Sequence, residues 1–216
     1  MPEPGHLVIT IARQLGSGGS ELAQRVARRL GVAYLDRQIL SDAAAALGVD
    51  EAAMETRCER LQGFWTRLLG AFALAAPASA FTPPPLNTPS DADILAAERD
   101  VLRQLAAKGP CVVLGHGGFH LLHGHARLLN VFVHGSEAFR VERVMRYYGA
   151  ADPEEARAAI ARSDAERGEY VAELSGALWE DARNYHLCLD AGALGLDRAE
   201  ALLTDLAAPL LREARP

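Results

Sequence analysis

The stretch LVITIARQLGSGGSELAQ, residues 7–24, indicates both the fold class and the first candidate site. Residues 7–12 are an apolar run typical of a buried strand, and residues 20–30 have the amphipathic spacing of a helix. A glycine-rich turn between a strand and a helix can point backbone N–H groups and the positive end of the helix dipole at an anion. Such turns also occur without a ligand. The predicted phosphate-binding residues are Gly16, Ser17, Gly18, Gly19, Ser20 and Glu21.

The rest of the chain alternates between short apolar runs and longer helical stretches. Further strands are predicted at residues 111–115, 128–133 and 186–190. Further helices are predicted at residues 92–108, 136–148, 153–166 and 193–212. Most of the strand segments are nearly continuous apolar runs, as expected when helices cover both faces of a sheet. The pattern predicts a three-layer α/β fold, with a parallel sheet flanked by helices.

Length and composition exclude several classes of protein. The chain has 216 residues, which is enough to bury the core of one domain, and we assign residues 1–216 to a single domain. Its formal net charge is -6, so its surface as a whole does not attract a nucleic acid or an anionic membrane. The longest other apolar stretch, residues 68–81, is interrupted by Pro77 and is too short to cross a bilayer. Neither nucleic-acid nor membrane binding is expected.

Cysteine usage predicts a cytoplasmic protein. Cys58, Cys111 and Cys188 are an odd number without metal-ligand spacing, which favours neither a disulfide framework nor a zinc site. Residues 50–90 are predicted to be a mostly helical insertion between the first crossover and the second strand, which includes a proline-rich loop at residues 82–90. Such an insertion could cover a site or hold a second substrate. The sequence leaves open whether the protein forms a homo-oligomer.

The segment at residues 10–40 and five later features resemble one known family in their order and spacing. The later features are CVVLGHGG at 111–118, LLNVFVHGSEAFRVERVMRYYG at 128–149, Asp164 to Tyr170, Trp179 before Tyr185, and HLCLDAG at 186–192. The chain resembles the cytidylate kinase-like proteins, within the P-loop nucleoside monophosphate kinases. The resemblance implies a P-loop kinase fold, ATP phosphates on the glycine loop with magnesium, and a nucleoside monophosphate acceptor such as CMP. It also implies a helical lid, which we assign to residues 137–180.

The chain departs from the pattern of true cytidylate kinases in the glycine loop. Arg13 stands at the position of the first glycine, and Gly19 stands at that of the phosphate-binding lysine. Lys108, the single lysine of the chain, precedes the second predicted strand and is a poor substitute. We expect Arg13 to supply part of the missing charge. The hydroxyl ligand of magnesium aligns with Glu21, and the nearest hydroxyl is that of Ser20, so these two residues are the predicted metal ligands.

A second departure lies on the acceptor side. True cytidylate kinases present an arginine after the strand that matches residues 111–115, where this chain has His116. A histidine is only partly charged near neutral pH and lacks the guanidinium fork, which predicts a weaker or different acceptor. The other predicted acceptor-binding residues are Asp36, Arg37 and Arg99.

The arginines of the predicted lid are the remaining candidates. Together with Arg13, the predicted catalytic residues are Arg140, Arg143, Arg162, Asp164 and Arg167, and Arg146 continues the same spacing. Arginines spaced in this way share a helix face and can converge on phosphate oxygens. The alternative is a solvated face, with ion pairs to Glu137 or Glu142 and a surface pair between Asp164 and Arg167.

Two other groups of residues are assigned no chemistry. The histidines at 116–125 lack a fixed ligand spacing and a partner cysteine, so a metal cluster is not expected. Trp179 and Tyr185 are expected to pack in the core rather than stack on a nucleobase.

The sequence thus predicts a nucleotide-binding protein that transfers a phosphoryl group from ATP to a nucleoside monophosphate. The alternative is a non-catalytic nucleotide-binding or regulatory protein with a degenerate phosphate loop. The missing lysine and the histidine at position 116 are the residues that favour this alternative.

Overall fold

The computed structural model describes residues 5–36, 91–115 and 117–212, with residues 91–98 described by their backbone alone. Five strands form one sheet in the order β2-β3-β1-β4-β5, and every neighbouring pair is parallel. The strands are β1 (Val8–Arg13), β2 (Ala33–Leu35), β3 (Cys111–Leu114), β4 (Leu128–His134) and β5 (Leu187–Asp190). All carboxyl ends therefore meet at one edge of the sheet.

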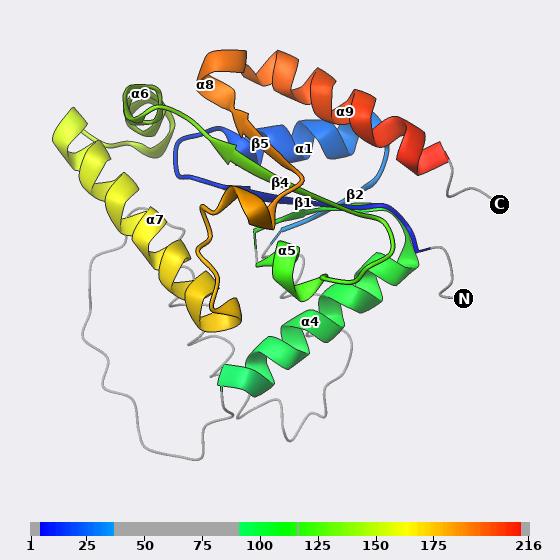
Figure 1. The fold of residues 1–216 in the computed structure, drawn as a ribbon. Helices are drawn as coiled ribbons and strands as arrows, with labels where there is room; N and C mark the ends of the chain where they lie inside the picture. The colour runs from blue at the N-terminus through cyan, green and yellow to red at the C-terminus, as the bar shows by residue number, and fades with distance from the viewer. Residues whose placement is uncertain (1–4, 37–90, 116, 213–216) are drawn as a thin grey trace.

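Helices cover both faces of this sheet and one of its ends (Figure 1). The helices are α1 (Gly19–Leu30), α4 (Asp91–Lys108), α5 (Gly118–Leu121), α6 (Glu137–Tyr148), α7 (Pro153–Ser175), the 3₁₀ turn η1 (Ala182–Asn184), α8 (Ala191–Leu194) and α9 (Leu196–Arg212). Helices α1 and α9 pack on one face, and α4 and α5 on the other. The predicted three-layer α/β architecture is confirmed.

The core follows the period-two alternation of the central strand. Ile9 and Ile11 of β1 join the buried cluster that contains α1 and α9, whereas Val8 joins the cluster that contains α4 and α5. Because helices cover both faces of the sheet, the buried side chains of β1 are apolar, apart from that of Thr10. Its hydroxyl donates to Asn130 Oδ1 at 2.6 Å, which satisfies both buried polar groups.

Helices α6 and α7 begin and end at residues typical of helix caps. Ser136 accepts a hydrogen bond from the N–H of Phe139 at the start of α6. Asp152 accepts from the N–H groups of Glu154 and Glu155, with Pro153 in the first turn of α7. Both helices end at a glycine in the left-handed conformation. These local signals set the start of the segment that was predicted as a lid.

One strand was not predicted, and two predicted helices were wrong in their extent. Strand β2 was not predicted, because its three residues carry little pattern and Ala33 is exposed. Helix α7 was expected to end at residue 166 but continues to Ser175, because Gly168 packs against the Trp179 ring instead of breaking the helix. The single helix expected at residues 193–212 is divided by Gly195, whose φ is 76°.

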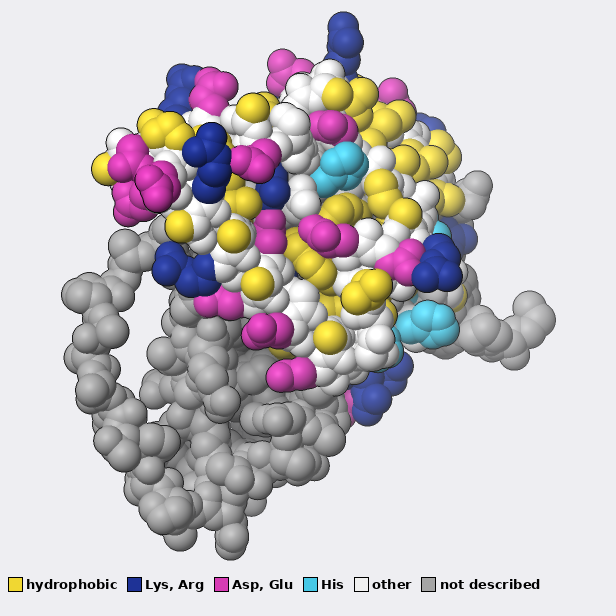
Figure 2. All heavy atoms as spheres, turned by 60° about the vertical axis from the view of Figure 1, so that its left-hand side comes forward, with side chains coloured by type: hydrophobic (Ala, Val, Ile, Leu, Met, Phe, Trp, Pro, Cys, Tyr) yellow, Lys and Arg dark blue, Asp and Glu magenta, His cyan; other side chains and the backbone are white. Residues whose placement is uncertain are grey.

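The predicted insertion at residues 50–90 lies outside the described residues, so it and the single-domain assignment stay predictions. No helix in the described part of the chain is both long and apolar enough for a bilayer-spanning segment. On the face drawn in Figure 2, acidic and basic side chains are interspersed and do not separate into patches of one sign.

We expect Leu203→Ala to lower the free energy of unfolding by about 2–5 kcal/mol, because it leaves a cavity between α9 and the sheet. Leu203 is 0% exposed. The matched control is Leu206→Ala on the same helix, where the leucine is 44% exposed, and its effect should stay below about 1 kcal/mol. Urea denaturation of both variants measures the difference. Equal losses would contradict the assignment of this face of α9 to the core.

Candidate functional site

The turn between β1 and α1 encloses a hollow of about 120 Å³ at the carboxyl edge of the sheet. Gly16 and Gly18 have φ values of 79° and 85°, a backbone conformation that glycine adopts readily and other residues rarely do. The N–H groups of Gly16, Gly18, Ser20 and Glu21 make no hydrogen bond to any residue that the structure describes. Several of them lie at the N-terminus of α1, where the helix dipole favours an anion. The turn can therefore accept an anionic group.

The turn is held in place from within. The Ser17 hydroxyl is buried and donates to the carbonyl of Gln14 at 2.9 Å, so it points into the turn. Leu15 packs in the cluster between α6 and α7. A Cβ added at Gly16 would lie 2.6 Å from the carbonyl oxygen of Arg140, which shows how closely the turn contacts α6. The glycine turn is consequently a packed element, with its shape fixed before any ligand arrives.

Arg13 is the last residue of β1, and its side chain is partly buried. It crosses Gly19 so closely that a Cβ at position 19 would lie 2.5 Å from Arg13 Cβ. Its Nη1 atom reaches Gly115 after β3, where an added Cβ would collide with it. Burial lowers the pKa of the Arg13 guanidinium, while Tyr34, Tyr148 and Asp36 act in the opposite direction. The Arg13 side chain thus lies beside the glycine turn and extends past it to Gly115.

Asp164 connects the turn to both helices of the predicted lid. Its Oδ1 accepts a hydrogen bond from the N–H of Leu15 at 2.9 Å and one from Arg167 Nη1 at 3.1 Å. Its Oδ2 accepts from Arg140 Nη1 of α6. The side chains of Arg140, Asp164 and Arg167 are only 12%, 15% and 7% exposed. The three are a mostly buried network and not the surface pair of the alternative interpretation.

Arg167 brings a second guanidinium to the turn. It donates to Ser163 Oγ at 2.8 Å and lines the hollow together with Arg13. Burial and the neighbouring Arg13 lower the pKa of Arg167 to about 9, while Asp164 opposes the change. Two neighbouring cations that repel one another, one buried and one partly buried, make this region electrostatically suited to an anion.

Arg143 lies at the outer side of the turn. Its Nη2 donates to Glu21 Oε2 at 3.0 Å, and its guanidinium stands 4.9 Å from the ring centroid of Tyr147. The Nε atoms of Arg140 and Arg143 are buried and have no hydrogen-bond partner among the described residues. A buried donor without an acceptor is unfavourable.

The two predicted metal ligands differ in their surroundings. The Ser20 hydroxyl makes no hydrogen bond to any described residue, and a magnesium ion needs few protein ligands when phosphates supply the others. The Glu21 carboxylate is engaged by Arg143 and lies 3.6 Å from Arg25. No group of three or more His, Cys, Asp or Glu side chains in the described ranges could hold a metal by itself. Ser20 fits the role, and the part of Glu21 stays a prediction.

The structure does not bring all candidates together. Arg162 is exposed on α7, and Arg146 is exposed with its guanidinium over the Tyr147 ring. Arg99 is exposed on α4, 3.7 Å from Asp100. Asp36 follows β2 and acts electrostatically on Arg13. Arg37 and His116 lie outside the described residues, so their roles stay predictions.

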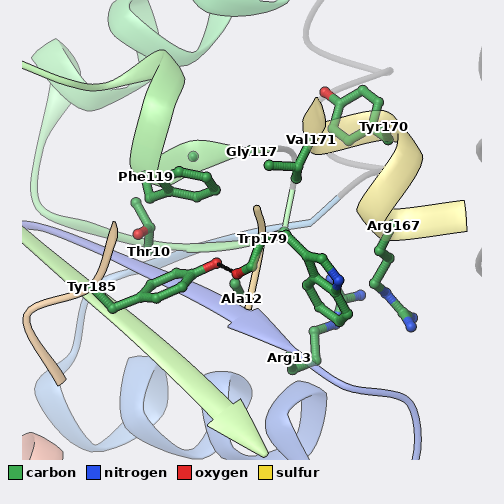
Figure 3. Close-up of a pocket in the computed structure, with 12 residues that line it drawn as sticks. Thr10, Ala12, Arg13, Gly117, Phe119, Arg167, Tyr170, Val171, Trp179 and Tyr185 are labelled. Carbon is green, nitrogen blue, oxygen red and sulfur yellow. Dashed lines mark hydrogen bonds between the residues drawn. The ribbon is translucent and has the colours of Figure 1, made fainter. Parts of the chain in front are cut away.

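A second hollow, of about 30 Å³, lies beyond Arg13 on the side of β3 and α5 (Figure 3). Arg13 and Arg167 extend beside the Trp179 ring and line this hollow as well as the first. Trp179 and Tyr185 are buried, and Tyr185 stacks on Phe132 at 5.0 Å and donates its hydroxyl to the Trp179 carbonyl. Their predicted packing role is confirmed.

Sequence reasoning missed several residues of this region. Gln14 donates to Glu180 Oε1 at 2.9 Å and accepts from the N–H of Gly135, which ties the turn to β4 and to the segment after α7. Tyr148 lines the first hollow, and Gly115 lines the second. The glycines of GHGG were a signal for a tight turn after β3, but nothing in the pattern linked them to Arg13.

Comparison with known proteins identifies a matching family and a solved structure with a similar fold. A family model described as the cytidylate kinase-like family matches residues 8–193. The crystal structure of an uncharacterized protein from Eubacterium ventriosum is similar, with a TM-score of 0.68 at 19% identity over 94% of this chain and 99% of that chain. At this identity the likeness concerns the fold alone. No curated protein matches the chain.

Two named kinases are less similar in structure. A gluconokinase from Sinorhizobium meliloti has a TM-score of 0.47 at 20% identity, over 98% of both chains. A shikimate kinase from Bacteroides thetaiotaomicron has a TM-score of 0.49 at 13% identity, over 94% of this chain and 98% of that chain. The family model covers nearly all of the described residues, and the glycine turn follows the central strand of a parallel sheet. The chain therefore belongs to the cytidylate kinase-like family and has the P-loop kinase fold.

Proposed function

We propose that the protein binds ATP on the glycine turn and transfers its γ-phosphoryl group to a nucleoside monophosphate such as CMP. The observation that carries the proposal is the first hollow. It combines backbone N–H groups without a partner among the described residues with two guanidiniums, those of Arg13 and Arg167. Phosphoryl transfer needs this combination, because catalysis rests on positioning the phosphates and neutralising their charge.

The turn and the arginines have different parts in this proposal. The N–H groups of Gly16, Gly18, Ser20 and Glu21 bind the phosphates already present in ATP, and they contribute equally before and during transfer. Arg140, Arg143 and Arg167 belong to α6 and α7 and meet the charge that develops on the transferring group. Residues 137–180 then act as the lid, and residues 50–90 cover the acceptor. Arg162, Arg37, Arg99 and His116 stay candidates for contacts that form on closure.

Magnesium, when bound with the nucleotide, neutralises part of the charge on its β and γ phosphates. The Ser20 hydroxyl is the side chain that we assign to it. Glu21 joins as a ligand only if it releases Arg143, to which it is bonded at 3.0 Å.

We also propose a cytoplasmic location, in keeping with the free thiols of Cys111 and Cys188 in the described part of the chain.

One observation favours the alternative, a nucleotide-binding or regulatory protein without turnover. Position 19 has no side chain, and Lys108 ends α4 just before β3 begins, at the opposite edge of the sheet from the glycine turn. No lysine of the chain therefore replaces the one absent from the turn. Measuring CDP formation from CMP and ATP, beside ATP binding by calorimetry, separates the two functions. Tight binding without transfer to any monophosphate supports the regulatory alternative.

We expect Gly16→Ala to weaken ATP binding at least tenfold, because the new methyl group collides with the carbonyl of Arg140 and displaces the turn. Gly31→Ala is the matched control. Gly31 has a φ of 66° and open space around its Cβ position, so the variant carries only the backbone strain of about 1–2 kcal/mol. Calorimetry with ATP and thermal unfolding measure binding and stability separately. If both variants bind ATP equally, the turn is not the nucleotide site.

We expect Arg143→Ala to lower turnover by about 10³-fold while ATP affinity falls far less, because a lid arginine acts mainly on the transition state. The control is Arg157→Ala on α7, whose guanidinium is exposed and pairs with Glu137. Steady-state transfer and ATP affinity are measured for both variants. Equal losses in turnover and affinity would make Arg143 a simple binding residue, and no loss would return it to a solvated face.

A further inference from the structure

We propose that the outer face of helix α9 is the contact surface of a homodimer, in which two copies of the helix pack antiparallel about a two-fold axis. The partner is a second copy of this chain. Two observations support the proposal: an exposed apolar stripe, and opposite charges beside it that have no partner among the described residues. The residues of this outer face are Arg198, Leu202, Asp205, Leu206, Pro209 and Leu210, all of them exposed.

The apolar stripe runs along α9. Leu202, Leu206 and Leu210 follow one another at intervals of four residues, so they lie on one side of the helix. They are 46%, 44% and 36% exposed, whereas Leu203 on the neighbouring side is fully buried. In Figure 2 apolar side chains gather along the upper right of the molecule, over α9. Burial of this stripe against another apolar surface is favourable.

The charged side chains of α9 fall into two groups. Asp197 and Glu200 lie toward α1, where both pair with Arg25. Arg198 and Asp205 are exposed beside the leucine stripe, and neither makes a hydrogen bond or an ion pair with any residue that the structure describes. The charges on the α1 side of the helix are therefore paired within the chain, and those on the outer face are open to a partner.

The order of these two charges makes the outer face complementary to itself. Arg198 and Asp205 are seven residues apart, which is about two helical turns, so they lie on the same flank of the stripe. In an antiparallel pair with a two-fold axis, the same flank of each copy meets. An axis that passes between residues 201 and 202 places Arg198 beside the partner's Asp205, and it does so twice by symmetry. The same register brings the two copies of Leu202 together.

The size and charge of the surface set the expected strength of the dimer. Helix α9 has 17 residues and is therefore about 25 Å long. A contact along one such helix buries less than about 1,200 Å² in total, at the low end for specific complexes. The net charge of -6 on each copy also opposes association. We therefore expect a reversible dimer with a dissociation constant in the micromolar range.

The oligomeric state of the full chain tests the apolar contact. Sedimentation equilibrium of the wild-type protein between about 2 and 200 µM should show monomer and dimer in exchange. Leu202→Glu should weaken the dimer at least about tenfold, because it places two carboxylates at the axis. The matched control is Leu178→Glu, where the leucine is 75% exposed and lies outside α9, and it should leave the equilibrium unchanged. Thermal unfolding checks that each variant is folded.

Charge reversal tests the antiparallel register separately from the apolar contact. Arg198→Asp and Asp205→Arg should each weaken the dimer about three- to tenfold, because each places like charges together in both symmetric contacts. The double variant Arg198→Asp/Asp205→Arg should restore the wild-type equilibrium. Both side chains are exposed and unpaired among the described residues, so these changes remove no contact of the described monomer.

Three results overturn the proposal. A wild-type protein that is monomeric at every concentration assigns the outer face of α9 to a different occupant. A dimer that Leu202→Glu leaves unchanged has its interface elsewhere. Single charge reversals without effect, or a double variant that does not recover, exclude the antiparallel register. The outcome is independent of the proposed function, because no residue of this face belongs to the glycine turn or to the predicted lid.

Discussion

The arrangement of this site depends on one carboxylate, that of Asp164. It accepts a hydrogen bond from the N–H of Leu15 in the glycine turn and pairs with Arg140 of α6 and Arg167 of α7. A mostly buried charge is stable only when it is paired and hydrogen-bonded, so the three partners are held together by the same requirement. The position of the turn and the position of the two arginines are therefore not independent. A movement of α6 or α7 therefore displaces Leu15 as well, through its hydrogen bond to Asp164.

The second constraint is the course of the Arg13 side chain, which lies against Gly19 of the glycine turn. Arg13 leaves the rigid end of β1 and crosses Gly19, so its course is determined by a strand and a helix N-terminus, not by a flexible loop. A guanidinium has a planar fork of donors and can bind an oxyanion through two hydrogen bonds, whereas an ammonium acts as a point charge. A site that uses arginines throughout gains directional contacts. It also gains repulsion between Arg13 and Arg167, which an anionic ligand relieves.

The sheet and the aromatic cluster give this charged region its rigid surroundings. Parallel strands bring the ends of β1, β2, β3 and β4 to one edge, which is where ligands bind in open α/β sheets. Behind that edge Phe132, Trp179 and Tyr185 pack against one another and against Val171 of α7. Their burial anchors α7 to the sheet, so the helix that carries Asp164 and Arg167 is held by apolar contacts that do not involve the ligand.

Much of the fold was determined by sequence alone, because continuous apolar runs such as those of β1, β3 and β4 can only be buried between two helical layers. The glycine turn could also be predicted, since its composition and its place between strand and helix are local. The three-residue β2 and the continuation of α7 past Gly168 could not, because each depends on a neighbour distant in sequence, β3 for the one and Trp179 for the other. Likewise the spacing of arginines indicated a shared face but not their partners. Only the tertiary structure brought Asp164 to Leu15, 149 residues away, and directed Arg13 across Gly19 to Gly115, because such contacts are decided by the packing of elements and leave no periodic mark in the chain.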